Sequence, residues 1–323
     1  MKTRDLIRKY GWEIMPTLSN LGVKLLGNGN VWFVDGNATN ALDSANGIAG
    51  NEWETPFATL NFAVSQCTAS QGDVILVAEE HAETIDDAGT ASGTTTDELV
   101  LDIAGITILG MGQNTARPTF TIGSADTTAS VVVTAADITV RGMIFVGGLA
   151  DLATLWDIAA GGDGLTIEDC EFRDGGTAIL ETIHQIDIAT TCDRVTINRC
   201  RFFTFAGGSS TLSNIEIATE VDHLTITNCY FKGDVNTDGM IDSSGGTGTE
   251  IYIADNVLDN VDAATGKCIV VAAGTTGFIG RNIMHAGLNG TSPLTTTACL
   301  AAQNYYTNAE AASAGILTPA VDT

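Results

Sequence analysis

Basic residues and long apolar runs are scarce in this sequence. Its 323 residues include 14 Lys and Arg against 39 Asp and Glu, which gives a formal net charge of −25. Because phosphate binding needs a basic surface, this charge excludes nucleic acid as a partner of the protein's body. No apolar run approaches the roughly 18 residues of a membrane-spanning helix, so no membrane partner is expected. With 44% hydrophobic residues, the chain is nevertheless able to bury a large core.

The sequence also lacks paired-cysteine motifs and a secretion signal. Seven cysteines is an odd number, and none belongs to a C-x-x-C pair, so neither a complete set of intrachain disulfides nor a zinc site is expected. The first 26 residues contain no continuous apolar stretch of signal-peptide type, because the charged residues Arg8, Lys9 and Glu13 divide the apolar residues into short runs. We therefore predict synthesis in the cytoplasm and buried, reduced thiols.

What the sequence does contain is an internal repeat. The strongest copies span residues 165–172, 195–202 and 224–231, at offsets of 30 and 29 residues, and each ends in Cys, a variable residue and Phe. Weaker copies lie at residues 106–111, 138–145, 251–258 and 277–284. A second strand-like segment precedes most copies, at residues 156–160, 186–190, 215–219 and 268–272. Two or three short strands in each unit of roughly 30 residues are typical of one coil of a parallel β-helix.

Stacked coils explain why single positions repeat. Successive coils lie about 4.8 Å apart, so each position recurs directly above itself. One inward column is predicted to contain Ile108, Val140, Ile167, Ile197, Ile226, Ile253 and Ile279. The next is predicted to contain Met143, Cys170, Cys200, Cys229, Asn256 and Asn282. A column that mixes Cys and Asn predicts a tight corner, where Asn side chains form hydrogen bonds along the stack and a thiol fits the same space.

With this repeat, the sequence resembles the right-handed parallel β-helix proteins of the pectin-lyase-like superfamily. Their repeats place asparagine at a stacked turn; Asn256 and Asn282 keep that residue, whereas the three cysteines of the strongest copies depart from it. The resemblance implies an all-β, single-stranded right-handed parallel β-helix over residues 30–305, with an N-terminal helical arm and cap.

Two further resemblances concern the N-terminal part of the chain. Residues 31–36, 55–64 and 72–77 resemble the opening segment of such proteins, in which a short helix covers the open end of the β-helix. Thr55 is predicted to cap this helix, with Pro56 at its first position. Residues 81–85, 101–106 and 110–118 resemble a β-helix group of tailed-bacteriophage structural proteins.

We expect three regions: an anchoring arm over residues 1–29, the β-helix over 30–305, and a C-terminal cap or tail over 306–323. Five basic and two acidic residues give residues 1–24 a charge of +3, so the remainder carries −28. The arm either docks the protein to a larger assembly or folds onto the base of the β-helix. Its predicted partner-binding residues are Lys2, Arg4, Leu6, Ile7, Arg8, Lys9, Tyr10 and Trp12.

Acidic residues supply the first candidate site. Asp163, Asp193 and Asp222 each lie two residues before a copy of the repeat and are expected to stack. They would form a cation site, a carboxylate pair for glycoside cleavage, or tight turns in which each Asp accepts a hydrogen bond from its own backbone. We favour the turns.

Other charged residues supply two more candidates. Glu171 and Arg201 lie one coil apart, as do Asp169 and Arg199, and we favour exposed ion pairs over sites that orient a uronic acid. Residues 234–242 begin like a calcium loop, but its twelfth position is glycine, so an acidic turn is favoured. The four histidines show neither metal nor triad spacing.

From these features we predict a phage virion structural protein that is not an enzyme and has no metal or cofactor. The favoured role is a homotrimeric capsid decoration or cement protein, which binds the major capsid protein through its N-terminal base and displays an acidic shaft outside the virion. The alternative is a tail spike or tail fibre protein that binds or depolymerises a host-surface polysaccharide.

Overall fold

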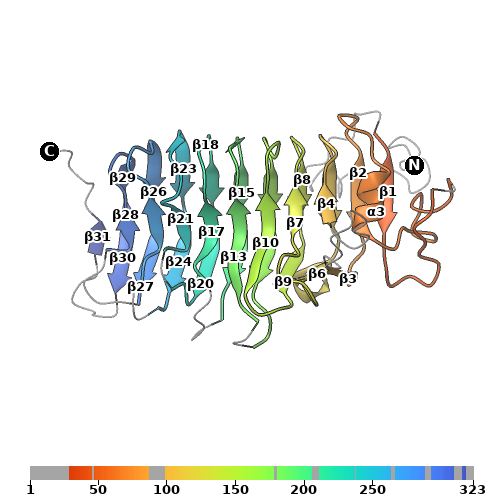
Figure 1. The fold of residues 1–323 in the computed structure, drawn as a ribbon, viewed down its shortest axis with the longest axis horizontal. Helices are drawn as coiled ribbons and strands as arrows, with labels where there is room; N and C mark the ends of the chain where they lie inside the picture. Colours follow the sequence, from red (N-terminus) through yellow and green to blue (C-terminus); the bar gives the residue numbers. More distant parts are fainter. Residues whose placement is uncertain are drawn as a thin grey trace.

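The computed structural model describes residues 29–45, 47–86, 99–177, 180–205, 211–236, 238–262, 266–287, 292–308 and 315–317. Over these residues the chain forms a right-handed parallel β-helix, a rod of stacked coils (Figure 1). A typical coil visits three sheets in turn, which we call sheet 1, sheet 2 and sheet 3. The predicted all-β parallel β-helix is confirmed, while residues 1–28 of the predicted helical arm lie outside the described residues.

The three sheets run the length of the rod. Sheet 1 contains β4 (Leu99–Leu101), β7 (Val131–Val133), β10 (Leu152–Ile158), β13 (Thr182–Ile188), β17 (Ser213–Ile217), β21 (Ile241–Ser243), β25 (Ile269–Val271) and β28 (Leu294–Thr295). Sheet 2 contains β1 (Val31–Val34), β2 (Val74–Val77), β5 (Thr107–Gly110), β8 (Thr139–Arg141), β11 (Thr166–Glu168), β15 (Thr196–Asn198), β19 (Thr225–Thr227), β23 (Ile251–Ala254), β26 (Gly277–Gly280) and β29 (Leu300–Ala302).

Sheet 3 and a short ladder complete the coils. Sheet 3 contains β3 (Ala82–Ile85), β6 (Thr119–Ile122), β9 (Ile144–Gly147), β12 (Glu171–Arg173), β16 (Arg201–Phe203), β20 (Tyr230–Gly233), β24 (Val257–Asn260), β27 (Ile283–Ala286), β30 (Asn304–Asn308) and β31 (Gly315–Leu317). Between sheets 1 and 2, three coils also pair through β14 (Cys192–Asp193), β18 (Val221–Asp222) and β22 (Gly248–Thr249). Neighbouring strands pair in parallel, except that β31 is antiparallel to β30.

The core consists of side chains stacked along the rod. The predicted inward column of sheet 2, from Ile108 to Ile279, pairs residue on residue, and each member is at most 1% exposed. Sheet 3 stacks Phe120, Phe145, Phe172, Phe202 and Phe231, whose neighbouring ring centroids lie 4.5 to 5.6 Å apart. Because alternate residues of a strand point to opposite faces, the same strands leave polar side chains outside.

The corner between sheets 2 and 3 contains the predicted column of Cys and Asn. Asn282 Oδ1 accepts from the backbone N–H of Asn256 (3.0 Å) and from its side-chain Nδ2 (3.1 Å), and Asn304 continues the ladder into the next coil. In earlier coils cysteine takes the same place, and Cys229 Sγ contacts backbone oxygens. All seven cysteines are buried and unpaired, as predicted.

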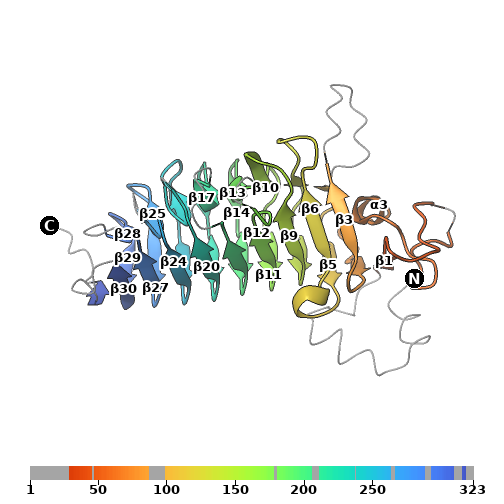
Figure 2. The same ribbon diagram turned by 90° about the horizontal axis from the view of Figure 1, so that it is seen from below.

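The helix at the N-terminal end, α3 (Leu60–Ser65), begins later than predicted (Figures 1 and 2). Thr59, not Thr55, caps it: its hydroxyl accepts from the Phe62 backbone N–H at 3.2 Å. The chain stays extended further because Phe57 forms a β-bridge with Val34 and packs in the core. The 3₁₀ helix over Asn114–Ala116 precedes β6.

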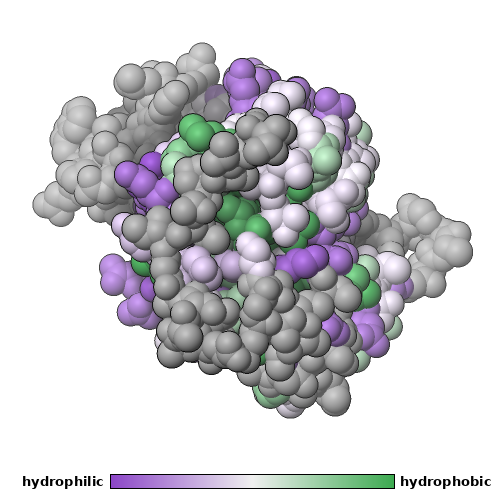
Figure 3. Space-filling view, turned by 90° about the vertical axis from the view of Figure 1, so that its left-hand side faces the viewer, coloured by the Kyte–Doolittle hydropathy of each residue, from purple (hydrophilic) through white to green (hydrophobic). Residues whose placement is uncertain are grey.

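The other end of the rod exposes apolar side chains. Viewed from this end, hydrophobic and hydrophilic surface are mixed, with one hydrophobic patch visible near the middle of the face (Figure 3). Leu300 is 62% exposed, Ile283 56% and Tyr305 52%. These three residues occupy outward-facing positions of β29, β27 and β30, beside inward-facing residues such as Met284 that stay buried.

Candidate functional site

Four carboxyl groups form a column on the outer face of sheet 1, which we call the acidic column. It consists of Asp157 on β10, Asp187 on β13, Glu216 on β17 and Asp242 on β21. The register pairs each residue with the next along the rod. Valine occupies the same register position in the strand before and the strand after, so the column spans four consecutive coils.

Strand periodicity positions these carboxyl groups. Glu216 lies between Ile215 and Ile217, both of which point into the core. Because side chains alternate across a strand, the acid between two buried residues must point outward. The other three coils repeat this arrangement, so the core packing that fixes the coils also fixes the acids.

Burial raises the pKa of each member of the column, and repulsion within the column raises the pKa values of Asp187 and Glu216 further. Burial, then the charge of Asp157, raises the pKa of Asp187 to about 6. Burial, then the charge of Asp242, raises the pKa of Glu216 to about 7, against an opposing hydrogen bond from Ser213. Burial also raises the pKa values of Asp157 and Asp242. Two carboxyl groups with pKa values near neutrality on adjacent strands are suited to acid–base chemistry.

The column has few compensating contacts within the described part of the chain. None of its four carboxyl groups forms an ion pair with another described residue. The Oδ1 atoms of Asp157 and Asp187 are buried and have no hydrogen-bond partner. Asp242, 1% exposed, accepts two hydrogen bonds from Ser244.

A histidine and a serine lie beside the column on the same face. His184 Nδ1 lies 2.7 Å from Ser213 Oγ, and Ser213 Oγ donates to Glu216 Oε2 at 3.2 Å. Burial lowers the pKa of His184, which favours the neutral ring. The serine lies between the histidine and the acid, whereas a catalytic triad needs the histidine between the other two. This chain of contacts orients Glu216 and is not a serine nucleophile.

The acidic column is not among the sites predicted from the sequence, although the sequence contains a signal for it. An acid between two apolar residues recurs at 157, 187 and 216, and the next acid, at 242, has an apolar residue only on its N-terminal side. Three of these acids fall in the predicted strand-like segments 156–160, 186–190 and 215–219, whereas Asp242 falls in the suggested calcium loop.

The favoured tight turns, in which each aspartate bonds its own backbone, are found only in part: Asp163 lies in a turn, whereas Asp193 and Asp222 lie on β14 and β18, and the bonds run to the next coil. Asp163 Oδ1 accepts from the backbone N–H of Asp193 at 2.8 Å. Asp222 Oδ1 accepts from the backbone N–H and hydroxyl of Thr249, and these bonds lower its pKa. The carboxylates of Asp163 and Asp222 therefore each fasten one coil to the next.

The predicted ion pairs are half correct. Arg199 Nε lies 2.8 Å from Asp169 Oδ1, as expected. The pairing of Glu171 with Arg201 is wrong, although the two residues are in register. Glu171 instead lies 2.7 Å from Arg117, which reaches it from the end of the 3₁₀ helix.

The remaining predicted residues supply no second cluster. Asp242, the last residue of the suggested calcium loop, belongs to the acidic column. No group of three or more His, Cys, Asp or Glu is placed to hold a metal ion in the described ranges. The predicted partner-binding residues of the arm, from Lys2 to Trp12, lie outside the described residues.

The raised pKa values predict a pH dependence of stability. A carboxyl group whose pKa is raised on folding destabilises the protein once it ionises, so the penalty is absent below about pH 4 and grows through about pH 6 to 7. Replacing Glu216 with glutamine is therefore expected to stabilise the protein at about pH 8 but not at about pH 4. Because solvent screens this half-exposed group, the gain is about 1 to 2 kcal/mol.

Denaturant unfolding of both proteins across this pH range measures the effect. Asp222→Asn is the matched control: the pKa of Asp222 is lowered on folding, so its loss destabilises the protein above about pH 4 and adds no further trend up to about pH 8. An unchanged difference between wild type and Glu216→Gln at all pH values would contradict the assignment.

No helix in the described part of the chain is long and apolar enough to cross a membrane. No known protein family and no curated protein matches the sequence. Solved structures similar in fold include pectate lyase Pel9A, with 14% identity over 85% of this chain and 70% of that one and a TM-score of 0.48. The pectin methylesterase from Aspergillus niger has 13% identity over 87% and 86%, with a TM-score of 0.48. ORF18 of Geobacillus virus E2 has 11% identity over 92% and 64%, with a TM-score of 0.35.

These findings correct the prediction that the protein is not an enzyme. The similar solved structures include proteins named as lyases and a methylesterase. That prediction depended on finding no catalytic cluster in the sequence, and it overlooked the acidic column. Identities this low show a shared fold and nothing finer. The protein has the right-handed parallel β-helix fold of pectate-lyase-like proteins, a fold that one phage protein also resembles.

Proposed function

We propose that the protein binds a glycan chain along the outer face of sheet 1 and hydrolyses its glycosidic bonds with the acidic column. The observation that supports this is the column itself, four carboxyl groups in register without ion pairs to described residues. Like charges directly opposite one another destabilise a sheet. Such a local conflict, within a rod that is otherwise consistently packed, is typical of a functional surface.

Glu216 and Asp187 take the two roles that hydrolysis needs. Glu216, with a pKa of about 7, keeps a protonated fraction at neutral pH and protonates the glycosidic oxygen as its bond to the anomeric carbon breaks. Asp187, with a pKa of about 6, ionises first and attacks that carbon as the carboxylate, which forms a glycosyl–enzyme ester as the protonated leaving sugar departs. A water molecule that loses its proton to Glu216 then attacks the same carbon, which breaks the ester, frees the product and restores both acids. Neighbouring strands lie about 4.8 Å apart, close to the roughly 5 Å between the carboxyl groups of retaining glycosidases.

The charge of the column favours hydrolysis over elimination. Elimination from a uronic acid builds negative charge on the sugar, which a neighbouring cation must stabilise. The column instead offers carboxyl groups, and these repel a polyuronate while stabilising the positive charge of an oxocarbenium-like transition state. A neutral or amino-sugar glycan is therefore the expected substrate.

Glu216→Gln is expected to reduce the rate of glycan hydrolysis about 100-fold, because glutamine cannot donate the proton. The measurement is the release of reducing ends from a panel of neutral, amino-sugar and uronic-acid polysaccharides. Wild-type activity should be greatest between about pH 6 and 7, where Asp187 is ionised and Glu216 is still partly protonated.

Asp222→Asn is the matched control, since it removes a carboxyl group of the predicted aspartate stack and leaves the acidic column intact. It should keep wild-type activity. If the wild-type protein releases no reducing ends from any glycan of the panel, or if Glu216→Gln is as active as wild type, the proposed hydrolysis is wrong.

Of the two roles expected from the sequence, this chemistry supports the tail spike or tail fibre alternative. The narrower role in capsid decoration depends on contacts of Lys2, Arg4 and their neighbours, which lie outside the described residues. That role, the homotrimer and the position on the virion exterior stay predictions.

A further inference from the structure

Arginines gather at one place on this acidic protein, far along the coil from the acidic column. Arg117, Arg141, Arg173, Arg199 and Arg201 lie around the turns between sheets 2 and 3, in a chain that has only 14 basic residues in all. They belong to consecutive coils, because β8 pairs with β11 and β11 with β15. A chain with a net charge of −25 thus carries a local concentration of cations.

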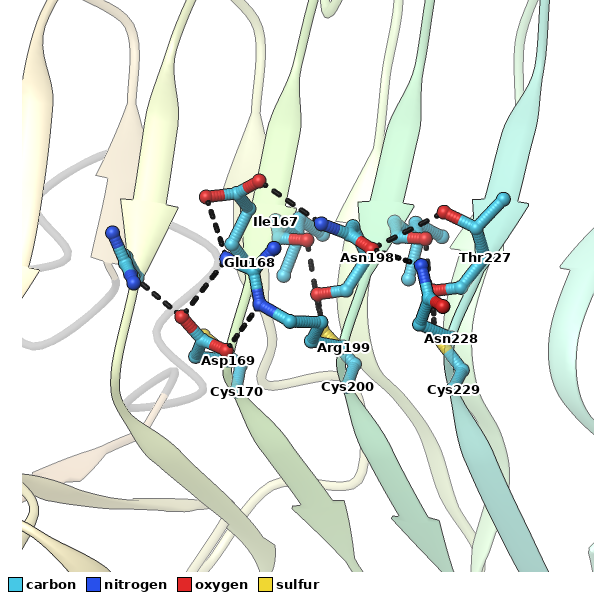
Figure 4. A network of polar contacts seen from close by, with 12 residues as sticks. Ile167, Glu168, Asp169, Cys170, Asn198, Arg199, Cys200, Thr227, Asn228 and Cys229 are labelled. Atoms are coloured by element: carbon cyan, nitrogen blue, oxygen red, sulfur yellow. Dashed lines mark hydrogen bonds and ion pairs between the residues drawn. The ribbon is translucent and has the colours of Figure 1, made fainter. Parts of the chain in front are cut away.

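Three carboxylates form ion pairs with four of these arginines. Asp169 is held from both sides, by Arg141 Nε at 2.7 Å and by Arg199 Nε at 2.8 Å. Arg199 also lies 3.3 Å from Glu168 (Figure 4). These contacts lower the pKa of Asp169 against the opposing effect of burial, so the carboxylate is ionised at neutral pH and the two arginines balance its charge.

Glu171 is the third of these carboxylates, and it pairs with two arginines other than Arg201. Its carboxylate lies 2.7 Å from Arg117 and 3.5 Å from Arg173. Arg117 is fixed further by donating to the carbonyl oxygens of Asn114 and Asp169. Glu171 is therefore turned away from Arg201, its register neighbour.

Arg201 is exposed, and its guanidinium has no hydrogen bond or ion pair with any described residue. It lines a pocket of about 190 Å³. The other lining residues are Asn114, Arg117, Asp169, Cys170 and Arg199. The pocket thus contains the free guanidinium of Arg201 and the Nη1 of Arg199, which forms no hydrogen bond with any described residue, beside an aspartate whose charge two arginines already balance.

We propose that this pocket binds a small oxyanion, with Arg201 as the principal ligand and Arg199 Nη1 as the second. A guanidinium presents parallel N–H donors that match the paired oxygens of a carboxylate or sulfate, which is why arginine is the usual residue for such groups. The ligand is therefore an anionic substituent, such as the carboxylate of an acidic sugar, or a free inorganic anion. The site is independent of the acidic column and of the proposed hydrolysis.

The test is an NMR titration of the full-length protein at low salt with three probes: glucuronate, inorganic sulfate and glucose. Glucuronate or sulfate should shift the signals of the arginine side chains, whereas neutral glucose should not. Arg201→Gln is expected to weaken anion binding at least about tenfold. Tighter binding of glucuronate than of sulfate identifies an acidic sugar as the ligand, and the reverse order identifies a free anion.

Arg281→Gln is the matched control. Arg281 occupies the same left-handed turn position as Arg199 (φ 57° and 54°) and pairs with Asp255 at 2.7 Å, but it does not line the pocket. This variant, like Glu216→Gln, should bind the anion as wild type does. Equal binding by wild type and Arg201→Gln, equal loss in Arg281→Gln, or no binding of either anion by wild type would overturn the proposal.

Discussion

Replacing Phe202 with alanine is expected to lower the free energy of unfolding by about 4 kcal/mol. The ring is completely buried, and it stacks between Phe172 (centroids 5.1 Å apart, planes inclined by 7°) and Phe231 (4.5 Å, 5°). Truncation removes both contacts and leaves a cavity that the rigid strands on either side cannot close. The loss is measured by denaturant unfolding followed by circular dichroism.

Phe203→Ala is the control, because the adjacent residue has the same side chain and points outward. Phe203 is half-buried, and its ring contact to Tyr230 is a tilted one at 5.9 Å. Its truncation should lower the free energy of unfolding by about 1 kcal/mol. Similar losses in the two variants would mean that the stack contributes nothing beyond ordinary surface contacts.

Replacing Asn282 with alanine is expected to lower the free energy of unfolding by about 3 kcal/mol. Its side chain accepts from the Asn256 backbone N–H and Nδ2 and donates to the Ile253 carbonyl at 3.0 Å. All of these groups are buried, so truncation leaves donors and an acceptor without partners, which costs more than the bonds themselves contribute. The measurement is again the denaturant midpoint.

Two further variants separate the causes of that loss. Asn198→Ala removes a half-exposed side chain whose partners can form hydrogen bonds with water instead, so it should lower the free energy of unfolding by about 1 kcal/mol or less. Asn282→Cys copies the residue that Cys229 provides in an earlier coil, so it restores packing but not the backbone bonds and should give an intermediate loss. If Asn282→Cys is as stable as wild type, the amide ladder is not what stabilises this corner.

The repeat was sufficient to predict the fold, because each inward position must match the same position one coil away. The columns that contain Ile167 and Cys170 could therefore be written down from the sequence and are found in the structure. The helix cap was misplaced because Thr55 and Thr59 both precede apolar residues, and only the core position of Phe57 decides between them.

The sites were harder to predict, since they depend on contacts that the repeat does not encode. Arg117 reaches Glu171 across 54 residues from a turn outside the repeat, so coil offsets alone paired Glu171 with the wrong arginine. The acidic column does follow the repeat, but only its outward positions reveal it. Its raised pKa values depend on burial, which requires coordinates.

The register of the coils also determines how disturbance spreads along the rod. Each strand pairs only with its two neighbours in the same sheet, so the free energy of the whole is a sum over adjacent coils, as in a one-dimensional lattice. The two end coils each have a single neighbour and are the first to open, whereas the coils around Phe202 open last. Unfolding therefore proceeds inward from the ends, and the central coils that contain both the acidic column and the arginine pocket are the most persistent part of the molecule.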